Sequence, residues 1–419
     1  MIKLSHSEFI SFLLAISAIL IISRLIAELG KKLHLPIVMG ELVVGIILGP
    51  TVLGMFFPEI FNYLFPTKNN ATIALDGITK LSVIMLLFVA GMEVQMPLVL
   101  KQGKVAIYTS IFSMIIPFIV GFGASWYFPV IFNADGTSSK FVFSLFFGTA
   151  LSISALPVIA RILMDMNIFK TSVGMLIIAS AMFNDLIGWL IFSLVLALSE
   201  HKHSYATIGY MAAYILGFGL FMLTIGKNII NRTLPWMQTK LSWPGGVLSL
   251  SLGVCLLCAA FTESIGIHAI LGAFIAGIAF GDSVHLHEKA REIIHQFVTN
   301  FFAPLFFVSI GLKVNFIENF NWFIVLFVLV LAYIGKVVGA TAGAYMGGMS
   351  RNNSLAVGFG MNARGAMEII LGTLALNAGI INGKIFVALV IMAMVTSLTS
   401  GPLMKKFIGK DQRITNLYE

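Results

Sequence analysis

The sequence predicts an all-α polytopic membrane protein with about 13 transmembrane helices. Apolar residues make up 58% of the 419 residues and charged residues only 11%, whereas soluble domains carry roughly 25% charged residues. The apolar residues also gather into stretches of about 20, the length that crosses a bilayer as a helix. Despite a net charge of +8, we do not expect nucleic acid as a partner, because most basic residues lie between the apolar stretches.

Thirteen apolar stretches follow one another with short links. The first lacks a small-residue cleavage site, so we expect a retained helix rather than a signal peptide. Cys255 and Cys258 share one apolar stretch, which favours buried thiols over a disulfide or a metal pair. The expected spans are residues 7–29, 36–56, 77–96, 104–128, 141–163, 171–199, 204–226, 243–262, 266–282, 294–312, 320–346, 353–378 and 383–404.

Basic residues alternate from one link to the next. They are numerous after odd-numbered spans, as at Lys227, Arg232 and Lys240, and sparse after even-numbered spans. By the positive-inside rule, this alternation predicts that the N-terminus lies outside and the C-terminus in the cytoplasm. We expect residues 409–419 to be a short cytoplasmic tail.

The chain matches itself at three places in the same order. Spans 2, 3 and 5 correspond to spans 9, 10 and 12, a shift of seven, so the two halves should face opposite ways. Inverted repeats are typical of secondary transporters. The matching segments are HLPIVMGELVVGIILGP (34–50) with GIHAILGAFIAGIAFGD (266–282), LLFVAGMEV (86–94) with LFFVSIGLKV (305–314), and FFGTALSIS (146–154) with AVGFGMNAR (356–364).

These matches predict a division of the chain into two inverted six-helix repeats. The first repeat should cover residues 1–200 and the second residues 243–408. Residues 201–242 should form a linking span with a cytoplasmic loop.

Two repeat-related spans are expected to be interrupted. Span 5 contains Pro157, which removes a backbone hydrogen bond and clashes with the preceding helical turn. Span 12 contains Gly358, Gly360 and Gly365. Broken helices at corresponding positions of two repeats are the best sequence pointer to a binding site near the membrane midplane.

Asp185 is the only charged residue within span 6. A carboxylate at membrane depth costs about 2.5–3.5 kcal/mol, and a bound cation would offset that cost. Because a proton and a monovalent cation would compete for the same oxygens, exchange follows from this competition. Asn184, Ser152 and Ser154 offer neutral oxygens of the kind that hard cations prefer, with the monovalent cation expected at Asp185 and Ser154. The alternative is a structural aspartate.

Lys336 lies in the middle of span 11, with no other charge near it in the sequence. A buried lysine must pair or lose its proton. Asp185 and the Asn184 carbonyl are candidate partners. The alternative is a lysine whose head reaches the membrane interface.

Arg364 and Glu368 are four residues apart in span 12. If this turn is helical, their side chains share one face and neutralise each other, which would brace the broken helix. A gating role is the alternative. Acids near span ends, such as Glu41, are expected to be ordinary boundary charges, and the alternative is that they line access funnels.

Seven motifs together resemble the monovalent cation:proton antiporter-2 family, and most closely the plant cation/proton exchangers and the spore-germination sodium/proton–potassium antiporters. They are LPIVMGELVVGIILGP, LLFVAGMEV, LSISALPVIARIL, AMFNDLIGWLIF, FFAPLFFVSIGLKVNF, the Gly-Lys pair of span 11 and GMNARGAMEIIL. The resemblance implies a 13-helix fold with a core domain, in which two broken helices cross, and a second domain that forms a homodimer. It also implies elevator-type alternating access, with Asp185 binding cation and proton in turn, Ser154 in the site, and Lys336 as the family's core lysine.

We therefore expect a secondary transporter rather than an enzyme. It should exchange Na⁺, with K⁺ as a second candidate, for protons in a bacterial inner membrane, with no cofactor and with the bilayer and a second copy as partners. A K⁺/H⁺ antiporter or K⁺ efflux system is the main alternative. An organic-anion symporter would favour a cationic midplane site, and a germination sensor would need a larger extramembrane domain.

The stoichiometry stays open. The Asn184–Asp185 pair resembles electroneutral exchangers, whereas a core lysine such as Lys336 resembles electrogenic ones.

Overall fold

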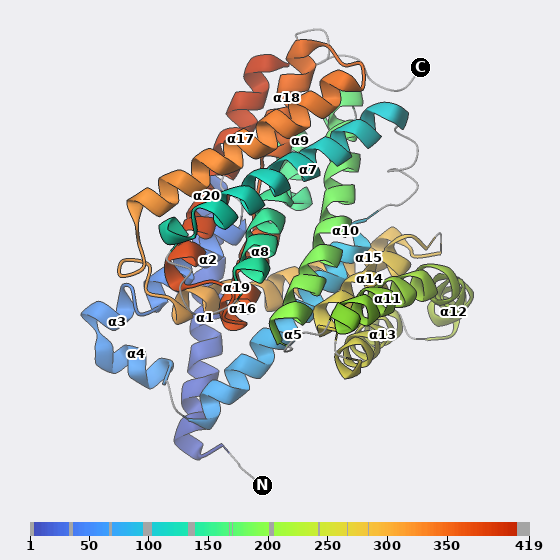
Figure 1. The fold of residues 1–419 in the computed structure, drawn as a ribbon. Helices are drawn as coiled ribbons and strands as arrows, with labels where there is room; N and C mark the ends of the chain where they lie inside the picture. The colour runs from blue at the N-terminus through green and yellow to red at the C-terminus, as the bar shows by residue number, and fades with distance from the viewer. Residues whose placement is uncertain are drawn as a thin grey trace. The chain divides into compact units, whose positions relative to one another are not determined.

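The computed structural model describes residues 4–32, 37–66, 69–94, 103–132, 139–166, 168–169, 171–200, 205–241, 244–265, 267–283 and 285–408. The helices follow the chain as Figure 1 shows. They are α1 (His6–Lys32), α2 (Ile37–Leu48), α3 (Leu53–Phe56), α4 (Pro58–Leu64), α5 (Asn70–Met92), α7 (Gly103–Tyr127), the 3₁₀ helix η1 (Pro129–Phe132), α8 (Lys140–Ser152), α9 (Leu156–Asp165), α10 (Ser172–Glu200), α11 (Tyr205–Phe221), the π-helix η2 (Met222–Gly226), α12 (Lys227–Lys240), α13 (Gly245–Ser264), α14 (Ala269–Gly281), α15 (Glu288–Phe297), the π-helix η3 (Val298–Phe302), α16 (Ala303–Lys313), α17 (Trp322–Met346), α18 (Arg351–Met361), α19 (Ala366–Asn377) and α20 (Gly383–Phe407).

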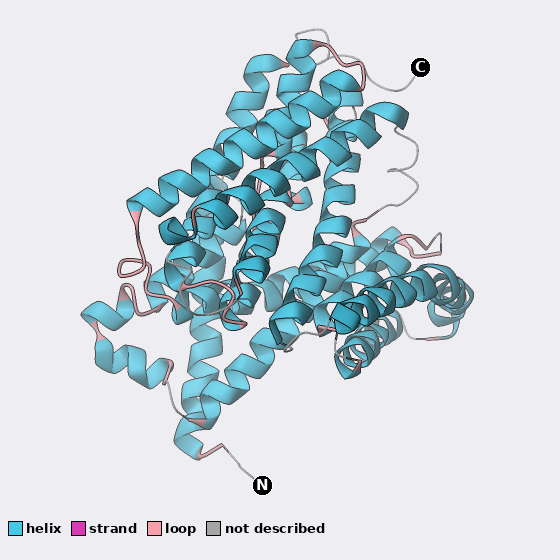
Figure 2. Cartoon of the chain, viewed as in Figure 1, coloured by secondary structure: helices cyan, strands magenta, loops and turns pink. Residues whose placement is uncertain are grey.

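All regular structure in the described part of the chain is helical (Figure 2). Ten helical segments of the described residues are long and apolar enough to cross a membrane, and three of them, Ile37–Phe56, Ala213–Trp236 and Glu288–Lys313, join two or three consecutive elements. The predicted all-α polytopic fold is therefore confirmed. The apolar helices α8, α14 and α19 have 13, 13 and 12 residues, less than a full crossing needs, so the count of 13 spans stays a prediction. The predicted tail, 409–419, lies outside the described residues.

Two predicted boundaries differ from the structure. The span expected over 36–56 is split, because α2 ends at Leu48 and α3 begins at Leu53 after a turn that contains Pro50. The helical conformation also continues from Met222 to Lys240, where a polar loop was expected after residue 226. The helix therefore runs past the expected end of span 7, and the assignment of residues 201–242 to a linking span with a cytoplasmic loop stays a prediction.

The chain forms two compact units, and each unit combines segments from both halves of the sequence. Unit 1 contains Met1–Val94 and Tyr210–Asn319, and unit 2 contains Gln95–Gly209 and Phe320–Glu419. The predicted boundaries at residues 200 and 243 separate sequence repeats, and a sequence repeat need not coincide with a compact unit. The repeat boundaries therefore stay a prediction.

In unit 1, glycines let pairs of helices approach closely. Gly45 of α2 packs on Gly311 of α16, where a Cβ on Gly45 would lie 2.5 Å from the Val308 carbonyl oxygen. Gly277 of α14 packs on Gly91 of α5 in the same way, with 3.0 Å between an added Cβ and the Gly91 Cα. Because Gly45 matches Gly277 and Gly91 matches Gly311 in the sequence repeat, the two helix contacts are repeat counterparts.

In unit 2, α17 packs along α7 (Figure 1). Gly335, Gly339 and Gly343 form a small-residue face of α17, and a Cβ on Gly339 would lie 2.6 Å from the Phe112 carbonyl oxygen. Small residues at four-residue spacing permit this close approach between membrane helices. As a result, Lys336 of α17 is held next to the middle of α7.

Both predicted interruptions are present in unit 2. Span 5 is divided into α8 and α9, and span 12 into α18 and α19. Ile153 has an extended backbone (φ −73°, ψ 150°), and Pro157 lies in the first turn of α9, where the missing N–H costs nothing. The break in span 5 thus follows from the proline, as expected.

Candidate cation and proton site

The two interrupted segments lie in contact with each other. The Ser154 hydroxyl donates to the Met361 carbonyl at 2.9 Å, and the Ala155 N–H donates to the Ala363 carbonyl at 3.1 Å. A Cβ on Gly365 would lie 2.7 Å from the Val158 side chain, so the second segment needs a glycine there. These contacts make a crossing of four half-helices inside unit 2.

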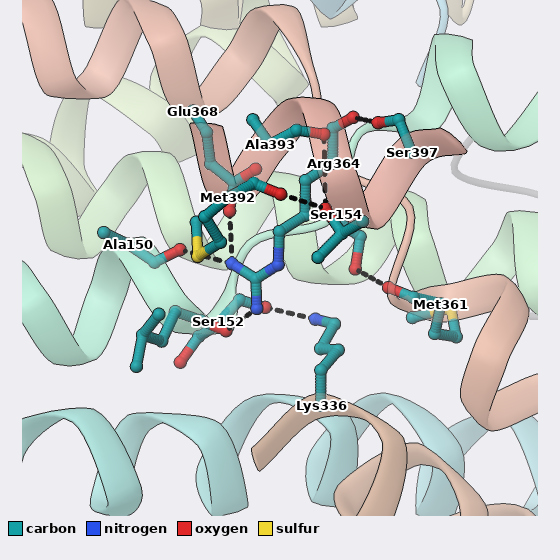
Figure 3. Close-up of polar contacts among 12 residues, drawn as sticks. Ala150, Ser152, Ser154, Lys336, Met361, Arg364, Glu368, Met392, Ala393 and Ser397 are labelled. Carbon is teal, nitrogen blue, oxygen red and sulfur yellow. Dashed lines mark hydrogen bonds and ion pairs between the residues drawn. The ribbon is translucent and has the colours of Figure 1, made fainter. Parts of the chain in front are cut away.

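The C-terminal end of α8 is covered by two cationic side chains. Arg364 donates from Nη1 to the Ala150 carbonyl at 3.0 Å and from Nη2 to the Leu151 carbonyl at 2.7 Å. Lys336 Nζ donates to the Ser152 carbonyl and, at 3.1 Å, to the Ser113 carbonyl. Figure 3 shows both cations converging on this helix end. They neutralise the partial negative charge that a helix carries at its C-terminus.

Arg364 also forms a buried ion pair with Glu368 (Figure 3). Their side chains are 0% and 2% exposed. The segment before α19 is not helical, so the contact does not arise from two residues within a helix, as the sequence suggested. Instead, Glu368 lies in the first turn of α19, where a negative charge complements the helix N-terminus. Ser397 donates to the Arg364 carbonyl and holds the segment from the other side.

Asp185 lies in the middle of α10, in the same unit as the crossing, and is 2% exposed. One turn later, Gly188 packs directly against the Ile153 side chain at the break of span 5. A larger residue at position 188 would separate α10 from this break. The glycine therefore allows the part of α10 that carries Asp185 to lie close to the break of span 5.

Asn184 connects α10 to α7 and α17. Its Nδ2 donates to Ser113 Oγ at 2.8 Å. With the amide rotated by half a turn, each atom faces a complementary partner. Oδ1 then accepts from Ser113 Oγ at 2.8 Å and from Lys336 Nζ at 3.1 Å, and Nδ2 donates to the Ser110 carbonyl at 3.1 Å. Such amide orientations are assigned from the hydrogen-bond network. Asn184 was one of the two partners considered for Lys336, and in this orientation its side-chain oxygen accepts a hydrogen bond from Lys336.

The two candidate serines differ in what their hydroxyls can offer a cation. The Ser154 proton is used by the Met361 carbonyl, which leaves the oxygen lone pairs available. The Ser152 hydroxyl lies 2.7 Å from the Gly148 carbonyl and 3.0 Å from the Met114 carbonyl. Because its hydroxyl lies between two carbonyls, Ser152 is better suited to joining α8 to α7 than to binding a cation.

Sequence reasoning missed several residues of this region. Ser110 and Ser113 of α7 contact Asn184, and Ser397 of α20 contacts the Arg364 backbone. Their only sequence signal is a hydroxyl in an apolar helix, which is common. Glu41, expected as an ordinary boundary charge, is only 3% exposed within α2, which an exposed charge at the end of a span would not be.

Comparison with known proteins identifies the family. Residues 15–406 match the family model described as sodium/hydrogen exchanger, transmembrane. The chain belongs to this exchanger family. It is therefore a membrane transporter and not an enzyme, and the resemblance inferred from the motifs is confirmed.

Several exchanger relatives are similar over nearly the whole chain. The Na(+)/H(+) antiporter NhaS4 of Synechocystis is 30% identical over 402 residues, which cover 94% of this chain and 97% of the relative. The Na(+)/H(+)-K(+) antiporter GerN of Bacillus cereus is 28% identical over 400 residues, covering 95% and 96%. Cation/H(+) antiporter 17 of Arabidopsis thaliana is 33% identical over 399 residues, covering 93% of this chain, which spans about half (47%) of that relative.

A solved structure of an exchanger shares the fold. The sodium proton antiporter MjNhaP1 of Methanocaldococcus jannaschii at pH 8 superposes with a TM-score of 0.64 at 17% sequence identity. The match covers 98% of this chain and 100% of that one. At this identity the comparison shows the architecture alone.

Proposed function

We propose that this exchanger carries Na⁺, and K⁺ as a second cation, in exchange for protons, and that Asp185 binds the cation and the proton in turn. One observation carries the proposal: a carboxyl that is 2% exposed on a membrane helix lies on the same compact unit as two interrupted helices in contact. Interrupted helices of this kind hold the substrate and ion sites of many secondary transporters.

The coupling follows from charge. Asp185 is neutral when it carries a proton, and its charge is balanced when it holds a monovalent cation. A bare carboxylate at membrane depth costs about 2.5–3.5 kcal/mol or more. The empty site, in which Asp185 is charged, therefore moves only slowly between the two sides of the membrane. Only the site that holds a cation or a proton changes sides readily. Ser154 supplies a neutral oxygen for the cation.

We further propose that one cation exchanges for one proton. Lys336 is engaged by the carbonyls of Ser113 and Ser152 and by the Asn184 amide. Since these contacts tie it to α7, α8 and α10, it acts as a fixed charge that does not leave the site during the cycle.

The mechanism proposed for the whole protein is elevator-type alternating access. All seven residues expected at the site lie within unit 2, so this unit can carry the bound ion while unit 1 forms the contact with a second copy in a homodimer. We place the protein in a bacterial inner membrane, with its N-terminus outside and its C-terminus in the cytoplasm, as the alternating loop charges suggest.

A proteoliposome assay tests the function. Vesicles with an acidic interior and an enclosed pH dye receive Na⁺, K⁺, Li⁺ or choline outside. We expect alkalinisation inside with Na⁺ and none with choline, and we expect Asp185→Asn to abolish it. No proton movement with any alkali cation in the wild type would overturn the proposal. Repeating the assay with the membrane voltage clamped by valinomycin and K⁺ tests the one-for-one stoichiometry.

Glu41→Gln is the matched control. Glu41 is also a buried membrane carboxyl, 3% exposed, but it lies in unit 1. We expect this variant to retain exchange, and loss of exchange in Glu41→Gln together with a normal Asp185→Asn would assign the exchanging carboxyl to unit 1.

K⁺/H⁺ exchange is the second candidate function. The K(+)/H(+) antiporter 1 of Saccharomyces cerevisiae is 31% identical over 412 residues, covering 95% of this chain and 46% of the relative. Alkalinisation with K⁺ at concentrations where Na⁺ gives none would favour this function.

A further inference from the structure

We propose that the side-chain oxygen of Asn362 is a further ligand of the transported cation, at the C-terminal end of α18. The inference rests on the proposed exchange of cations and protons and adds to it a residue from the second repeat. It is carried by three observations, which concern the Asn362 side chain, its neighbours in the chain, and the repeat-related end of α8.

The first observation is that Asn362 is buried without hydrogen bonds to its side chain. The residue is 1% exposed, and neither Oδ1 nor Nδ2 has a hydrogen-bond partner among the described residues. Leaving a buried polar group without a partner costs about 1–3 kcal/mol, and most such groups are satisfied in native proteins by protein atoms, water or ions. The Asn362 amide therefore has both its oxygen and its nitrogen available to a partner outside the described residues, such as a water molecule or an ion.

The second observation is where Asn362 lies. Its two neighbours in the chain make the contacts between the interrupted segments: the Met361 carbonyl accepts from the Ser154 hydroxyl, and the Ala363 carbonyl accepts from the Ala155 N–H. Asn362 thus lies between these two contacts. Ser154, the serine with lone pairs available to a cation, is bonded to the adjacent residue.

The third observation is a difference between repeat-related helix ends. In the alignment of 146–154 with 356–364, Ser152 at the end of α8 corresponds to Asn362 at the end of α18. The α8 end is already covered by Arg364 and Lys336. A transported cation would meet two fixed positive charges there.

The α18 end has no such cover. The carbonyls of Phe359 and Gly360 accept from backbone N–H groups at 3.3 Å, and the Met361 carbonyl accepts from Ser154. In the described part of the chain, no lysine or arginine side chain hydrogen-bonds to these three carbonyls. The partial negative charge of this helix C-terminus is thus not neutralised by a hydrogen-bonded cationic side chain, and the side-chain oxygen of Asn362 lies at the same end. Hard monovalent cations prefer oxygens of this kind.

Equilibrium binding of radiolabelled Na⁺ to the detergent-purified protein tests the inference. We expect Asn362→Ala to raise the Kd for Na⁺ about fivefold to tenfold, because the cation loses one oxygen ligand. A tenfold change in Kd corresponds to about 1.4 kcal/mol. Asn362→Asp, which provides a charged oxygen, should lower the Kd. This gain cannot come from misfolding, so it keeps the test valid if Asn362→Ala is unstable.

Ser144→Ala is the matched control. Ser144 in α8 is also fully buried with an unpartnered hydroxyl, but it lies eight residues, or about 12 Å of helix, from Ser152. Its Kd should equal that of the wild type, and Asp185→Asn should bind no Na⁺.

The outcomes separate the two proposals. If Asp185→Asn abolishes binding while both Asn362 variants keep the wild-type Kd, Asn362 binds only a structural water and the inference is overturned, although the proposed function stands. If Asp185→Asn binds Na⁺ like the wild type, both proposals fail. A higher Kd in Asn362→Ala with a lower one in Asn362→Asp supports the ligand role.

Discussion

At the scale of single residues, the core of unit 2 holds its buried charges with several hydrogen-bond partners each, although Arg364 Nε and Glu368 Oε2 have none among the described residues. Arg364 serves three acceptors: two carbonyls of α8 and the Glu368 carboxylate. A buried ion pair adds little net stability relative to an apolar pair, but removing one partner leaves an uncompensated buried charge. The pair is thus better understood as a fixed connection between two half-helices than as a source of stability.

Breaking this pair on one side should be costly. We predict that Arg364→Gln lowers the free energy of unfolding by about 3–5 kcal/mol, because it leaves Glu368 and two carbonyls without a donor. The double variant Arg364→Gln/Glu368→Gln should lose less than the sum of the two single variants. Denaturation of the purified protein in detergent measures both.

A surface pair provides the comparison for this cycle. Arg24 and Glu28 are also four residues apart, at 2.8 Å, but their side chains are 62% and 48% exposed. Arg24→Gln should lower the stability less than Arg364→Gln does, because it leaves no deeply buried charge without a partner. Equal losses in Arg24→Gln and Arg364→Gln would contradict the bracing role of the buried pair.

Some residues of the site could be predicted from the sequence and others could not. Asp185 and Lys336 were recognisable because each is a lone charge in an apolar span, and charge at membrane depth is rare. Ser113 and Asn362 were not assigned, because hydroxyls and amides are tolerated in many membrane helices. Their roles depend on which helices meet, and that information is not local.

At the scale of elements, glycines decide which helices can touch. Gly277 of α14 lies against Phe88 and Gly91 of α5, and any side chain there would collide with backbone atoms. Backbone cannot move aside as the end of a flexible side chain can. The interruptions of spans 5 and 12 were predictable from proline and glycine, but the pairing of α14 with α5 required the structure.

We predict that Gly277→Ala prevents α14 from packing on α5 and sharply reduces the yield of folded protein. Gly253→Ala in α13 is the control, because an added Cβ there meets nothing within 4 Å. It should be neutral or slightly stabilising, by up to about 1 kcal/mol. Size-exclusion profiles and thermal unfolding of both variants provide the measurement, and a wild-type profile for Gly277→Ala would refute the prediction.

At the scale of the whole molecule, the chain assembles two units from alternating segments of its sequence. Hydropathy predicted most of the spans and the internal matches predicted the repeat. Neither predicted the two units, because their boundaries depend on contacts between segments far apart in the chain. The candidate site belongs entirely to unit 2, which allows the two units to have separate roles.

Rigid-body transport makes a prediction about distances. Cys255→Ala/Cys258→Ala should remain active, because both thiols are free. Spin labels are then placed on exposed positions Trp236 of unit 1 and Tyr345 of unit 2, or on Tyr127 and Tyr345 within unit 2. We expect the first distance distribution to change between Na⁺ at high pH and Na⁺-free buffer at low pH, while the second stays constant. An unchanged first distribution would argue against an elevator.

The composition of unit 1 has a consequence for its synthesis. The Thr51 hydroxyl donates to the Val314 carbonyl, 263 residues later in the chain, and Gly45 needs Gly311 as its packing surface. At roughly 5–20 residues per second, a ribosome takes about 13–53 s to make that length. During this time α2 is in the bilayer with its glycine face uncovered. The glycine face of α2 is therefore exposed to wrong partners for as long as the ribosome takes to reach α16.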